Sequence, residues 1–517
     1  MSFSKVYSAQ TNLLSVTPIS VETDITSRTL YAFAVVGLPD KAVEESRDRV
    51  SAAIKNSGFD SPKSQNQKIV ISLAPADLKK EGPSFDLAMA LSYLLANDEI
   101  EFDSEGKIFL GELSLDGKVR PVHGVLPIAR FAKQNNFKEL YVPIENVQEA
   151  ALIDGLNIFG VSSLKVLIEH LIGTAKILKA DLTIVRGVKR VANIDFSDVR
   201  GQERAKRGLL IAAAGGHNCA MYGPPGTGKT MLAKAFAGIL PELSFEEALE
   251  ATSIHSVAGT LSETFITNPP FRAPHHTASY VSLVGGGATP RPGEITLAHF
   301  GVLFMDEFPE FDRRVIESLR QPLEDKVISI SRAKGTAHFP ADVLLVAAMN
   351  PCPCGNFGFR GKPCICTPSA LSRYRRKMSG PIMDRIDIWL EVDRVLPSDL
   401  HDDGGSLPAG RQGDKSETFR TKVERARGAQ KERFDKKGRK LSRNSEMSAR
   451  DIVTLVTLDK ESRRTLDLAA ERLGFSPRVY HRMIKVARTI ADLEGSEEIK
   501  NAHILEAVEY RPKKFDV

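Results

Sequence analysis

The sequence predicts an α/β protein whose central region is a parallel, doubly wound sheet. A glycine-rich loop in that region lies between a short apolar strand and a helix, and two later apolar strands end in polar side chains. Strands that alternate with helices form such sheets and bind ligands at their carboxyl ends. Mixed strand and helix patterns precede this core and helical patterns follow it. We therefore expect an α+β domain before the core and a helical lid after it.

The glycine-rich loop, GPPGTGKT at residues 223–230, fits the P-loop pattern G-x-x-x-x-G-K-[ST]. The apolar run 219–222 predicts a buried strand before it, and residues 231–237 have helical periodicity. Glycines let backbone N–H groups surround phosphates, and a helix N-terminus adds partial positive charge. We expect Lys229 to pair with the β- and γ-phosphates and Thr230 to bind Mg²⁺. The predicted nucleotide-binding residues are Gly223, Pro224, Pro225, Gly226, Thr227, Gly228, Lys229 and Thr230.

Two later strands supply the other polar groups of the predicted site. Residues 301–305 are apolar and lead to Asp306 and Glu307, which is typical of a Walker B strand. We expect Asp306 to hold Mg²⁺ through water and Glu307 to polarise the attacking water. Residues 341–349 resemble a second buried strand and end at Asn350, whose amide can orient water beside the γ-phosphate. The alternative is that Asn350 only forms a turn before a proline.

Composition limits the class of protein. A chain of 517 residues has room for about three domains. Its formal charge of +5 permits a nucleic-acid partner without requiring one. No apolar run approaches membrane-spanning length, and the N-terminus lacks the apolar core of a signal peptide. We expect a cytoplasmic protein.

Four of the five cysteines lie close together, in the pattern C-x-C-x₉-C-x-C. Four thiolates suit tetrahedral Zn²⁺, and clustered cysteines indicate a metal more than a secreted disulfide framework. The spacing is tighter than the usual C-x₂-C, and free cysteines in a reducing cytosol are the alternative. A zinc ion would fix the loop that follows Asn350. The candidate ligands are Cys352, Cys354, Cys364 and Cys366.

The N-terminal domain contains a serine, Ser84, whose flanking residues resemble those of a catalytic site. Residues 81–88 and 111–122 resemble the proteolytic domain of Lon-type proteases, and Ser84 occupies the position of the nucleophile. The position of the lysine base is occupied by Leu126, which cannot accept a proton. We interpret Ser84 as a helix N-cap and the domain as an inactive scaffold or partner-binding module.

Further segments resemble the magnesium-chelatase-like AAA+ ATPases, and most of all their ComM/YifB branch. The likeness covers essentially the whole chain and includes the order of the domains. A loop at 402–410 is longer than the family pattern. The segments that carry the resemblance are the P-loop, residues 271–277, 285–287, 290–295, the strand before Asp306, and residues 379–387.

The resemblance implies an ATP-driven hexameric ring that acts on single-stranded or branched DNA, with ATP and Mg²⁺ as cofactors. Helicase or branch-migration activity in recombination or natural transformation is the implied function. Arg385 matches the arginine finger, which acts across a head-to-tail interface. The alternative is a surface arginine paired with Asp384 or Asp387. Arg478 matches the lid arginine that senses the γ-phosphate, with a surface role as the alternative.

Residues 327–339 alternate apolar and polar side chains on both sides of a turn, which predicts a β-hairpin. In this class of ATPase such a hairpin points into the ring channel, so Arg332 and Lys334 are expected to contact DNA phosphates. The alternative is an ordinary exposed turn. We assign His275 and His276 to a pore loop and not to a metal site, because adjacent side chains point apart and no acidic partner is near.

The predicted domains are a Lon-like, S5-like α+β domain at 1–175, a linker at 176–196, the AAA+ core at 197–395, a flexible loop at 396–416, and the helical lid at 417–517. Two other functions remain open. A magnesium-chelatase motor subunit is one, although nothing in the sequence binds a porphyrin. An ATP-driven protein-remodelling or protease-like regulator is the other, and Leu126 argues against its proteolytic form.

Overall fold

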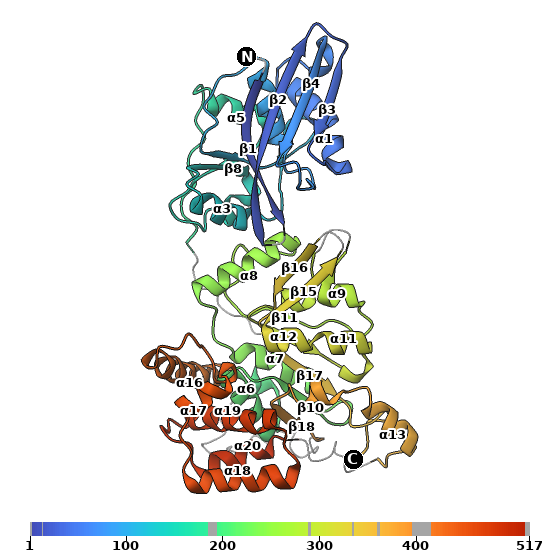
Figure 1. The fold of residues 1–517 in the computed structure, drawn as a ribbon, viewed down its shortest axis with the longest axis vertical. Coiled ribbons are helices and arrows are strands. Elements are labelled where there is room, and N and C mark those ends of the chain that lie inside the picture. Colours follow the sequence, from blue (N-terminus) through green and yellow to red (C-terminus); the bar gives the residue numbers. More distant parts are fainter. Residues whose placement is uncertain are drawn as a thin grey trace, which may run out of the picture. The chain divides into compact units, whose positions relative to one another are not determined.

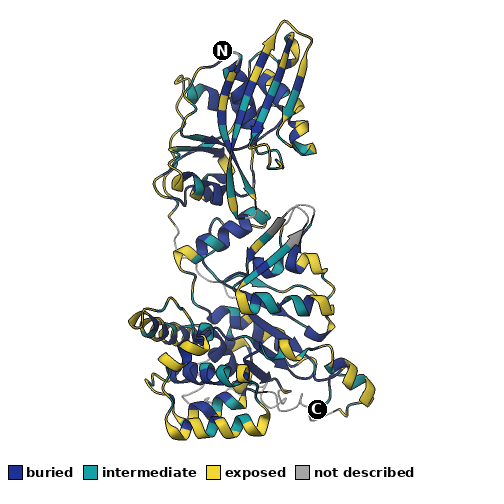
Figure 2. Ribbon diagram, viewed as in Figure 1, coloured by how far each residue is buried: buried dark blue, intermediate teal, exposed yellow. Residues whose placement is uncertain are grey.

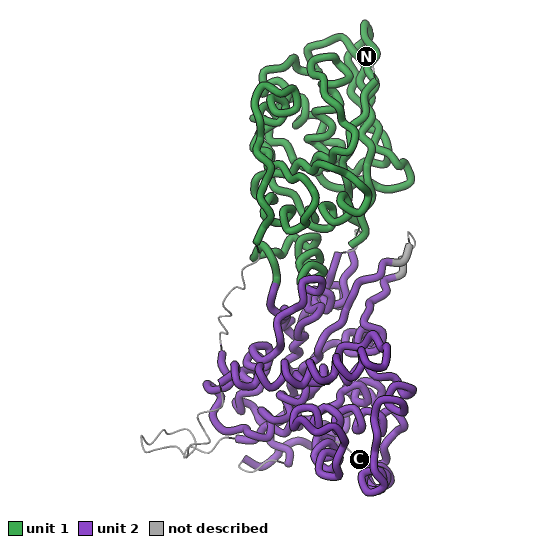
Figure 3. Tube along the Cα trace, turned by 90° about the vertical axis from the view of Figure 1, so that its left-hand side faces the viewer, with its two compact units in different colours: residues 1–187, 248–266 green, residues 188–247, 267–517 purple. Residues whose placement is uncertain are grey.

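A computed structural model describes residues 3–12, 14–184, 194–287, 291–332, 335–358, 362–394 and 415–511. The chain is a mixed α/β protein that forms two compact units (Figure 3). One unit comprises Met1–Gly187 with Ala248–Ile266, and the other comprises Val188–Glu247 with Thr267–Val517. Most of the loop predicted at 396–416 and part of the linker predicted at 176–196 lie outside the described residues. Within the described residues, no helix has both the length and the apolar character needed to span a bilayer.

The first unit has a four-stranded sheet and a smaller parallel sheet, in keeping with the predicted α+β pattern (Figure 1). In the larger sheet, β3 pairs parallel to β4 and the other pairs are antiparallel. Helix α2 is almost wholly buried, which explains its near-continuous run of apolar residues. The strands are β1 (Phe3–Asn12), β2 (Ser15–Ser27), β3 (Ala32–Val36), β4 (Gln67–Ala74), β5 (Lys107–Phe109), β6 (Glu112–Leu113), β7 (Val119–Arg120), β8 (Glu139–Pro143) and β9 (Asn157–Val161), and the helices include α1 (Lys41–Asn56), α2 (Asp86–Ala96), α3 (Val125–Gln134), α4 (Val147–Ala150) and α5 (Leu164–Leu171).

The interpretation of Ser84 as a helix N-cap is wrong. Helix α2 begins at Asp86, its N-cap is Phe85, and the cap makes no side-chain hydrogen bond. The start of the helix is fixed instead by the Asp86 carboxylate, which forms an ion pair of 2.8 Å with Arg49 and accepts a hydrogen bond of 3.2 Å from the Leu113 backbone N–H. A buried carboxylate requires such partners, and this requirement positions the turn that carries Ser84.

Helix α8 (Phe245–Ala258) contributes most of its length to the first unit, although it follows the P-loop helix in sequence. The Ser256 hydroxyl accepts a hydrogen bond of 3.1 Å from the Gly124 N–H and donates one to the Glu149 carboxylate. Glu149 also accepts a hydrogen bond of 3.0 Å from the backbone N–H of Leu126, whose side chain is fully buried. Leu126 is therefore a core residue of this unit.

The second unit is built on a five-stranded sheet with the order β11-β14-β17-β10-β18, in which every pair is parallel. This confirms the predicted parallel, doubly wound sheet. All residues of β10, β14 and β17 are buried, as Figure 2 shows, so their side chains read as continuous apolar runs. The elements are β10 (Cys219–Tyr222), β11 (Phe271–Arg272), β14 (Val302–Met305), β17 (Leu344–Met349) and β18 (Ile388–Glu391), with α6 (Glu203–Gly215) and α7 (Lys229–Ile239) among the helices that pack on them.

The C-terminal part of the second unit is helical. Helix α19 begins with Pro477 in its first turn and the Ser476 hydroxyl accepting a hydrogen bond from the Val479 N–H. Helix α18 is largely exposed (Figure 2). Helix α19 is mostly buried, and its apolar side chains belong to the same hydrophobic core as those of the parallel sheet. The helices are α16 (Ser416–Lys436), α17 (Ala449–Leu455), α18 (Lys460–Leu473), α19 (Pro477–Leu493) and α20 (Asn501–Glu509).

Candidate nucleotide-binding site

The P-loop connects strand β10 to helix α7. Gly226 and Gly228 have φ angles of +76° and +88°, a region in which side chains are strained, so the glycine pattern is a backbone requirement. The Lys229 ammonium donates hydrogen bonds to the carbonyl oxygens of Gly223 at 2.9 Å and Pro224 at 2.8 Å. Burial lowers the pKa of Lys229, and the nearby Asp306 carboxylate opposes that shift. An ammonium held by neutral carbonyls can exchange them for phosphate oxygens.

The two residues predicted to hold Mg²⁺ are in direct contact. The Thr230 hydroxyl, in the first turn of α7, donates a hydrogen bond of 2.9 Å to Asp306 Oδ2 at the end of β14. Asn350, at the end of β17, accepts a bond of 3.3 Å from Lys229 Nζ through its side-chain oxygen. The carboxyl ends of three neighbouring parallel strands thus bring Lys229, Thr230, Asp306 and Asn350 together, with a hydroxyl and carboxylate of the type that Mg²⁺ prefers.

Glu307, the predicted water-polarising residue, has an unexpected partner. His276 Nδ1 lies 3.0 Å from Glu307 Oε2, and the rings of His275 and His276 have centroids 4.2 Å apart. The inference that these histidines point apart and lack an acidic partner is therefore wrong. His276 follows β11, a strand of two residues that pairs with β14, and loops after paired parallel strands emerge at the same edge. A strand that short gives no periodic signal in the sequence.

Arg385 and Arg478 meet at one carboxylate. Glu324, on helix α12 (Arg320–Asp325), forms an ion pair with Arg385 and another of 2.6 Å with Arg478. Burial raises the pKa of Glu324, but the two guanidinium groups outweigh it and hold that pKa below its ordinary value. Arg385 is buried and also donates a bond of 2.7 Å to the Pro381 carbonyl. Among the described residues, no hydrogen bond or ion pair joins either arginine to the P-loop.

Asp387, one of the alternative partners considered for Arg385, has another role. Asp387 contacts Arg482 and lies 3.2 Å from His217 Nδ1. These contacts hold the pKa of Asp387 below its ordinary value even though burial opposes this. Arg385 therefore does not form the alternative surface pair with Asp387.

The four clustered cysteines converge on one point. Their Sγ atoms all lie within 4.8 Å of one another. Cys352 and Cys354 are 3.4 Å apart, and Cys364 lies 3.7 Å from the former and 3.6 Å from the latter. Thiolates at about 2.3 Å from a tetrahedral Zn²⁺ are about 3.8 Å from each other. The tight C-x-C spacing therefore does not prevent a four-sulfur metal site.

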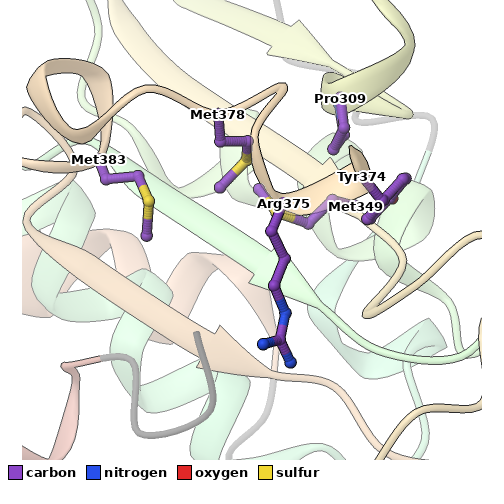
Figure 4. A pocket seen from close by; sticks show the side chains of 6 residues that line it. All are labelled: Pro309, Met349, Tyr374, Arg375, Met378 and Met383. Carbon is purple, nitrogen blue, oxygen red and sulfur yellow. The ribbon is translucent and has the colours of Figure 1, made fainter. Parts of the chain in front are cut away.

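A small cavity of about 30 Å³ lies beside the Asn350 strand (Figure 4). Tyr374, on helix α13 (Pro368–Arg375), donates a hydrogen bond of 3.0 Å to the Asn350 carbonyl. Figure 4 shows the Arg375 side chain extending away from the methionines, and its guanidinium lies 5.1 Å from the Phe357 ring centroid. The cavity is too small for a nucleotide. The lining residues are Pro309, Met349, Tyr374, Arg375, Met378 and Met383.

The predicted hairpin is confirmed as an antiparallel pair, β15 (Val327–Arg332) and β16 (Gly335–Pro340), in which Arg332 is opposite Gly335. Lys334 and the side chain of Arg332 lie outside the described residues, so their contact with DNA stays a prediction. Helix α12 precedes the hairpin and strand β17 follows it. Along the chain, the hairpin therefore lies between Glu324, the carboxylate that pairs with both candidate arginines, and Asn350, which follows strand β17.

Ion pairs fix the base of the hairpin. Lys326, just before β15, lies 3.0 Å from Asp342 and 2.5 Å from Glu446. Arg443 lies 2.5 Å from Asp342 and 2.9 Å from Glu446. Burial raises the pKa of Glu446, but Arg443 and Lys326 outweigh this and hold it at about 2. The C-terminal helical part is therefore tied to the foot of the hairpin.

Comparison with known proteins agrees with this geometry. Residues 195–400 match the family described as magnesium chelatase, subunit ChlI; residues 21–146 match subunit ChlI of Mg-chelatase, and residues 413–511 match its C-terminal part. The chain is 41% identical over 517 residues to competence protein ComM of Haemophilus influenzae, covering 99% of this chain and 98% of that protein. It is 42% identical over 513 residues to protein YifB of Escherichia coli, covering 99% and 97%.

A shorter likeness concerns the N-terminal region. Lon protease 2 of Bacillus subtilis is 35% identical over 100 residues, which are 19% of this chain and 18% of that protein. The full-length relatives, the family matches, the parallel sheet and the P-loop agree. The chain therefore belongs to the magnesium-chelatase-like AAA+ ATPases, in their ComM/YifB branch, with a Lon-like region at its N-terminus.

Proposed function

We propose that this protein is an ATP-hydrolysing hexameric ring that moves along or remodels DNA, as a helicase or branch-migration motor in recombination or natural transformation. One observation carries the proposal. The hairpin β15–β16 continues into β17, and the residue after that strand, Asn350, contacts the P-loop lysine. A change at the γ-phosphate therefore has a short covalent route to an element that can contact DNA.

The chemistry assigned to the site follows from its geometry. Bound Mg²⁺ would supply charge neutralisation for the phosphates, held by Thr230 and Asp306, which share a hydrogen bond. Lys229 would exchange its carbonyl partners for phosphate oxygens. Once the Glu307 carboxylate breaks its contact with His276, it would polarise the attacking water. Asn350 would orient that water.

The remaining parts of the proposal are the ring and its surroundings. Arg385 would act on the nucleotide of the neighbouring subunit, which requires a head-to-tail interface and favours a closed ring. Arg478 would report the γ-phosphate to the lid. We propose a cytoplasmic location, which the free cysteines support, and Zn²⁺ as the ion of the cysteine cluster. The N-terminal region would be an inactive scaffold.

The printed name of the relative ComM, a competence protein, supports DNA over the other substrates considered. A chelatase motor would need partner chains and a porphyrin, and a protein remodeller would be stimulated by unfolded polypeptide. The experiment that separates these is the ATPase rate without DNA and with single-stranded, duplex and branched DNA. We expect stimulation by DNA and no hydrolysis by Lys229→Ala. An ATPase indifferent to every DNA, or stimulated only by unfolded polypeptide, would refute the proposal.

A further inference from the structure

The cysteine cluster is attached to the nucleotide site at both of its ends. Cys352 follows Asn350 by two residues, and Cys366 precedes helix α13 by two. Tyr374 of that helix returns to donate its hydrogen bond to the Asn350 carbonyl. Residues 352–358 thus leave from Asn350, and residues 362–366 lead into a helix that contacts Asn350 again.

The first turn of this loop is pressed against the P-loop. Gly355 has a φ of +79°, and a Cβ placed there would lie 2.5 Å from Cδ of Pro225. The Gly355 N–H donates a bond of 2.9 Å to the Cys352 carbonyl, which closes the turn. The adjacent backbone also joins the P-loop, because Gly223 N–H donates to the Met349 carbonyl at 3.2 Å. A shift of this turn would therefore displace the phosphate-binding loop.

Hydrophobic burial does not hold the second half of the cluster. Ile365, between Cys364 and Cys366, is 83% exposed. The sulfurs are 3.4 Å or more apart, so the structure contains no disulfide among them. The Phe357 N–H donates to Cys352 Sγ at 3.3 Å, as backbone groups do to a metal-bound thiolate. Four soft sulfur ligands select Zn²⁺ over Mg²⁺.

We infer that Cys352, Cys354, Cys364 and Cys366 bind one Zn²⁺, and that this zinc site braces Gly355 against Pro225 so that zinc occupancy sets the affinity of the P-loop for ATP. The inference rests on the nucleotide site of the proposed function. Without zinc, the exposed second half of the cluster loses its attachment to the first. The turn at Gly355 and the Asn350 side chain then lose their fixed position beside the P-loop.

Two measurements on the full chain test the inference, both without DNA. Zinc content is measured by elemental analysis after purification without added zinc, and Co²⁺ loading provides a spectrum of tetrahedral thiolate ligation. ATP affinity is measured by titration with a fluorescent ATP analogue and Mg²⁺. We expect about one zinc per chain in the parent. Cys354→Ser should lose the zinc and bind ATP at least about tenfold more weakly, because the P-loop would lose its fixed contacts with Gly355 and Asn350; tenfold corresponds to about 1.4 kcal/mol.

A second variant separates the brace from the metal. Gly355→Ala keeps all four thiols but places a methyl group against Pro225, so it should retain zinc and still lose ATP affinity. Parental helix and strand content of the full chain, measured by circular dichroism, controls for folding in both variants. A parent without zinc, a zinc-free Cys354→Ser with parental ATP affinity, or a Gly355→Ala with parental affinity would each overturn the inference. A parent that binds zinc but no ATP would refute the proposed function and the coupling together.

Discussion

At the scale of single residues, the proposed chemistry depends on what Glu307 touches. Its carboxylate is about half exposed and its Oε2 lies 3.0 Å from His276 Nδ1. A carboxylate oxygen engaged in that bond is not available to polarise water. The neighbouring Asp306 instead contacts Thr230, at the place predicted for Mg²⁺. The two adjacent carboxylates therefore have separable roles.

The first prediction separates nucleotide binding from hydrolysis. Lys229→Ala should abolish ATP binding, because the ammonium is the side-chain cation predicted for the phosphates. Glu307→Gln should bind ATP normally and hydrolyse it very slowly, because an amide cannot accept the proton of the attacking water. Equilibrium binding and steady-state phosphate release check both variants. Glu307→Gln turning over at the parental rate would remove the role given to Glu307.

The second prediction concerns His276. If its bond keeps Glu307 from the water, His276→Ala should raise the DNA-independent ATPase rate by roughly three- to tenfold, which corresponds to one net hydrogen bond of about 1 kcal/mol. His276→Asn keeps a donor and should behave more like the parent. His275→Ala is the matched control, because His275 Nδ1 contacts Thr277 and not Glu307. A basal rate that His276→Ala leaves unchanged or lowers would contradict this role.

Whether these residues and their contacts could be predicted depends on how far apart along the chain the residues lie. Lys229 and Thr230 are fixed by the spacing within one loop, and Asp306 and Asn350 each end a buried strand, so sequence patterns identified them. Their mutual contacts are consistent with those roles without testing them. The bond between His276 and Glu307 depends on the pairing of a two-residue strand, which no local pattern indicates. Glu324, the shared partner of Arg385 and Arg478, lies 61 and 154 residues from them along the chain, so no local pattern indicates that contact either.

At the scale of elements, the hairpin is the part that links the nucleotide to DNA in this account. Its foot is held by Lys326 and Asp342, which pair with Arg443 and Glu446 from the C-terminal helical part. The hairpin therefore has a fixed base beside the lid. Other basic candidates are already engaged: Arg272 pairs with Glu294 at 2.6 Å. Arginines of α16 donate to the carbonyls of Gly238, Leu493 and Ala213.

The third prediction tests the hairpin tip. Arg332→Ala with Lys334→Ala should weaken DNA binding to all sequences alike, because phosphate contacts carry no sequence information. The slope of log affinity against log salt should flatten by roughly one unit per lost contact, while ATPase without DNA stays near parental. Arg332→Lys with Lys334→Arg keeps both charges and is the matched control. An unchanged salt slope with normal DNA stimulation would place the contact elsewhere, at Arg272 or on α16.

Elements were predictable where one periodicity ran through them. Strand β10 has the predicted bounds, and the hairpin forms as expected. The start of α2 was not predictable, because the long-range ion pair between Asp86 and Arg49 decides it. The placement of α8 in the first unit is equally non-local, since it depends on the bonds of Ser256 with Glu149 and Gly124.

At the scale of the whole molecule, the proposed mechanism requires each subunit to supply an arginine to the nucleotide site of its neighbour. Within one chain, Arg385 is buried and held by Glu324, which also holds Arg478. A finger that acts in trans must be presented to the neighbouring nucleotide, so ring assembly has to change or use this arrangement. The carboxylate that both arginines share makes their positions interdependent.

The fourth prediction follows from that arrangement. Arg385→Ala should bind ATP normally and hydrolyse it about 10³-fold or more slowly, the effect known for arginine fingers. Mixing it with Lys229→Ala should restore part of the activity, because an intact finger on one subunit can serve an intact P-loop on its neighbour. Subunit exchange must be demonstrated by labelled chains in the same mixtures. Absence of rescue despite exchange would count against a finger in trans.

The central claim is that ATP hydrolysis moves DNA, and its most direct test is the conversion of a labelled branched DNA into its separated products. The parent protein should convert the substrate with ATP and Mg²⁺, but not with a non-hydrolysable analogue. Glu307→Gln should bind the same DNA without converting it. Conversion that proceeds equally without ATP, or no conversion by a parent whose ATPase is strongly stimulated by that DNA, would contradict the account.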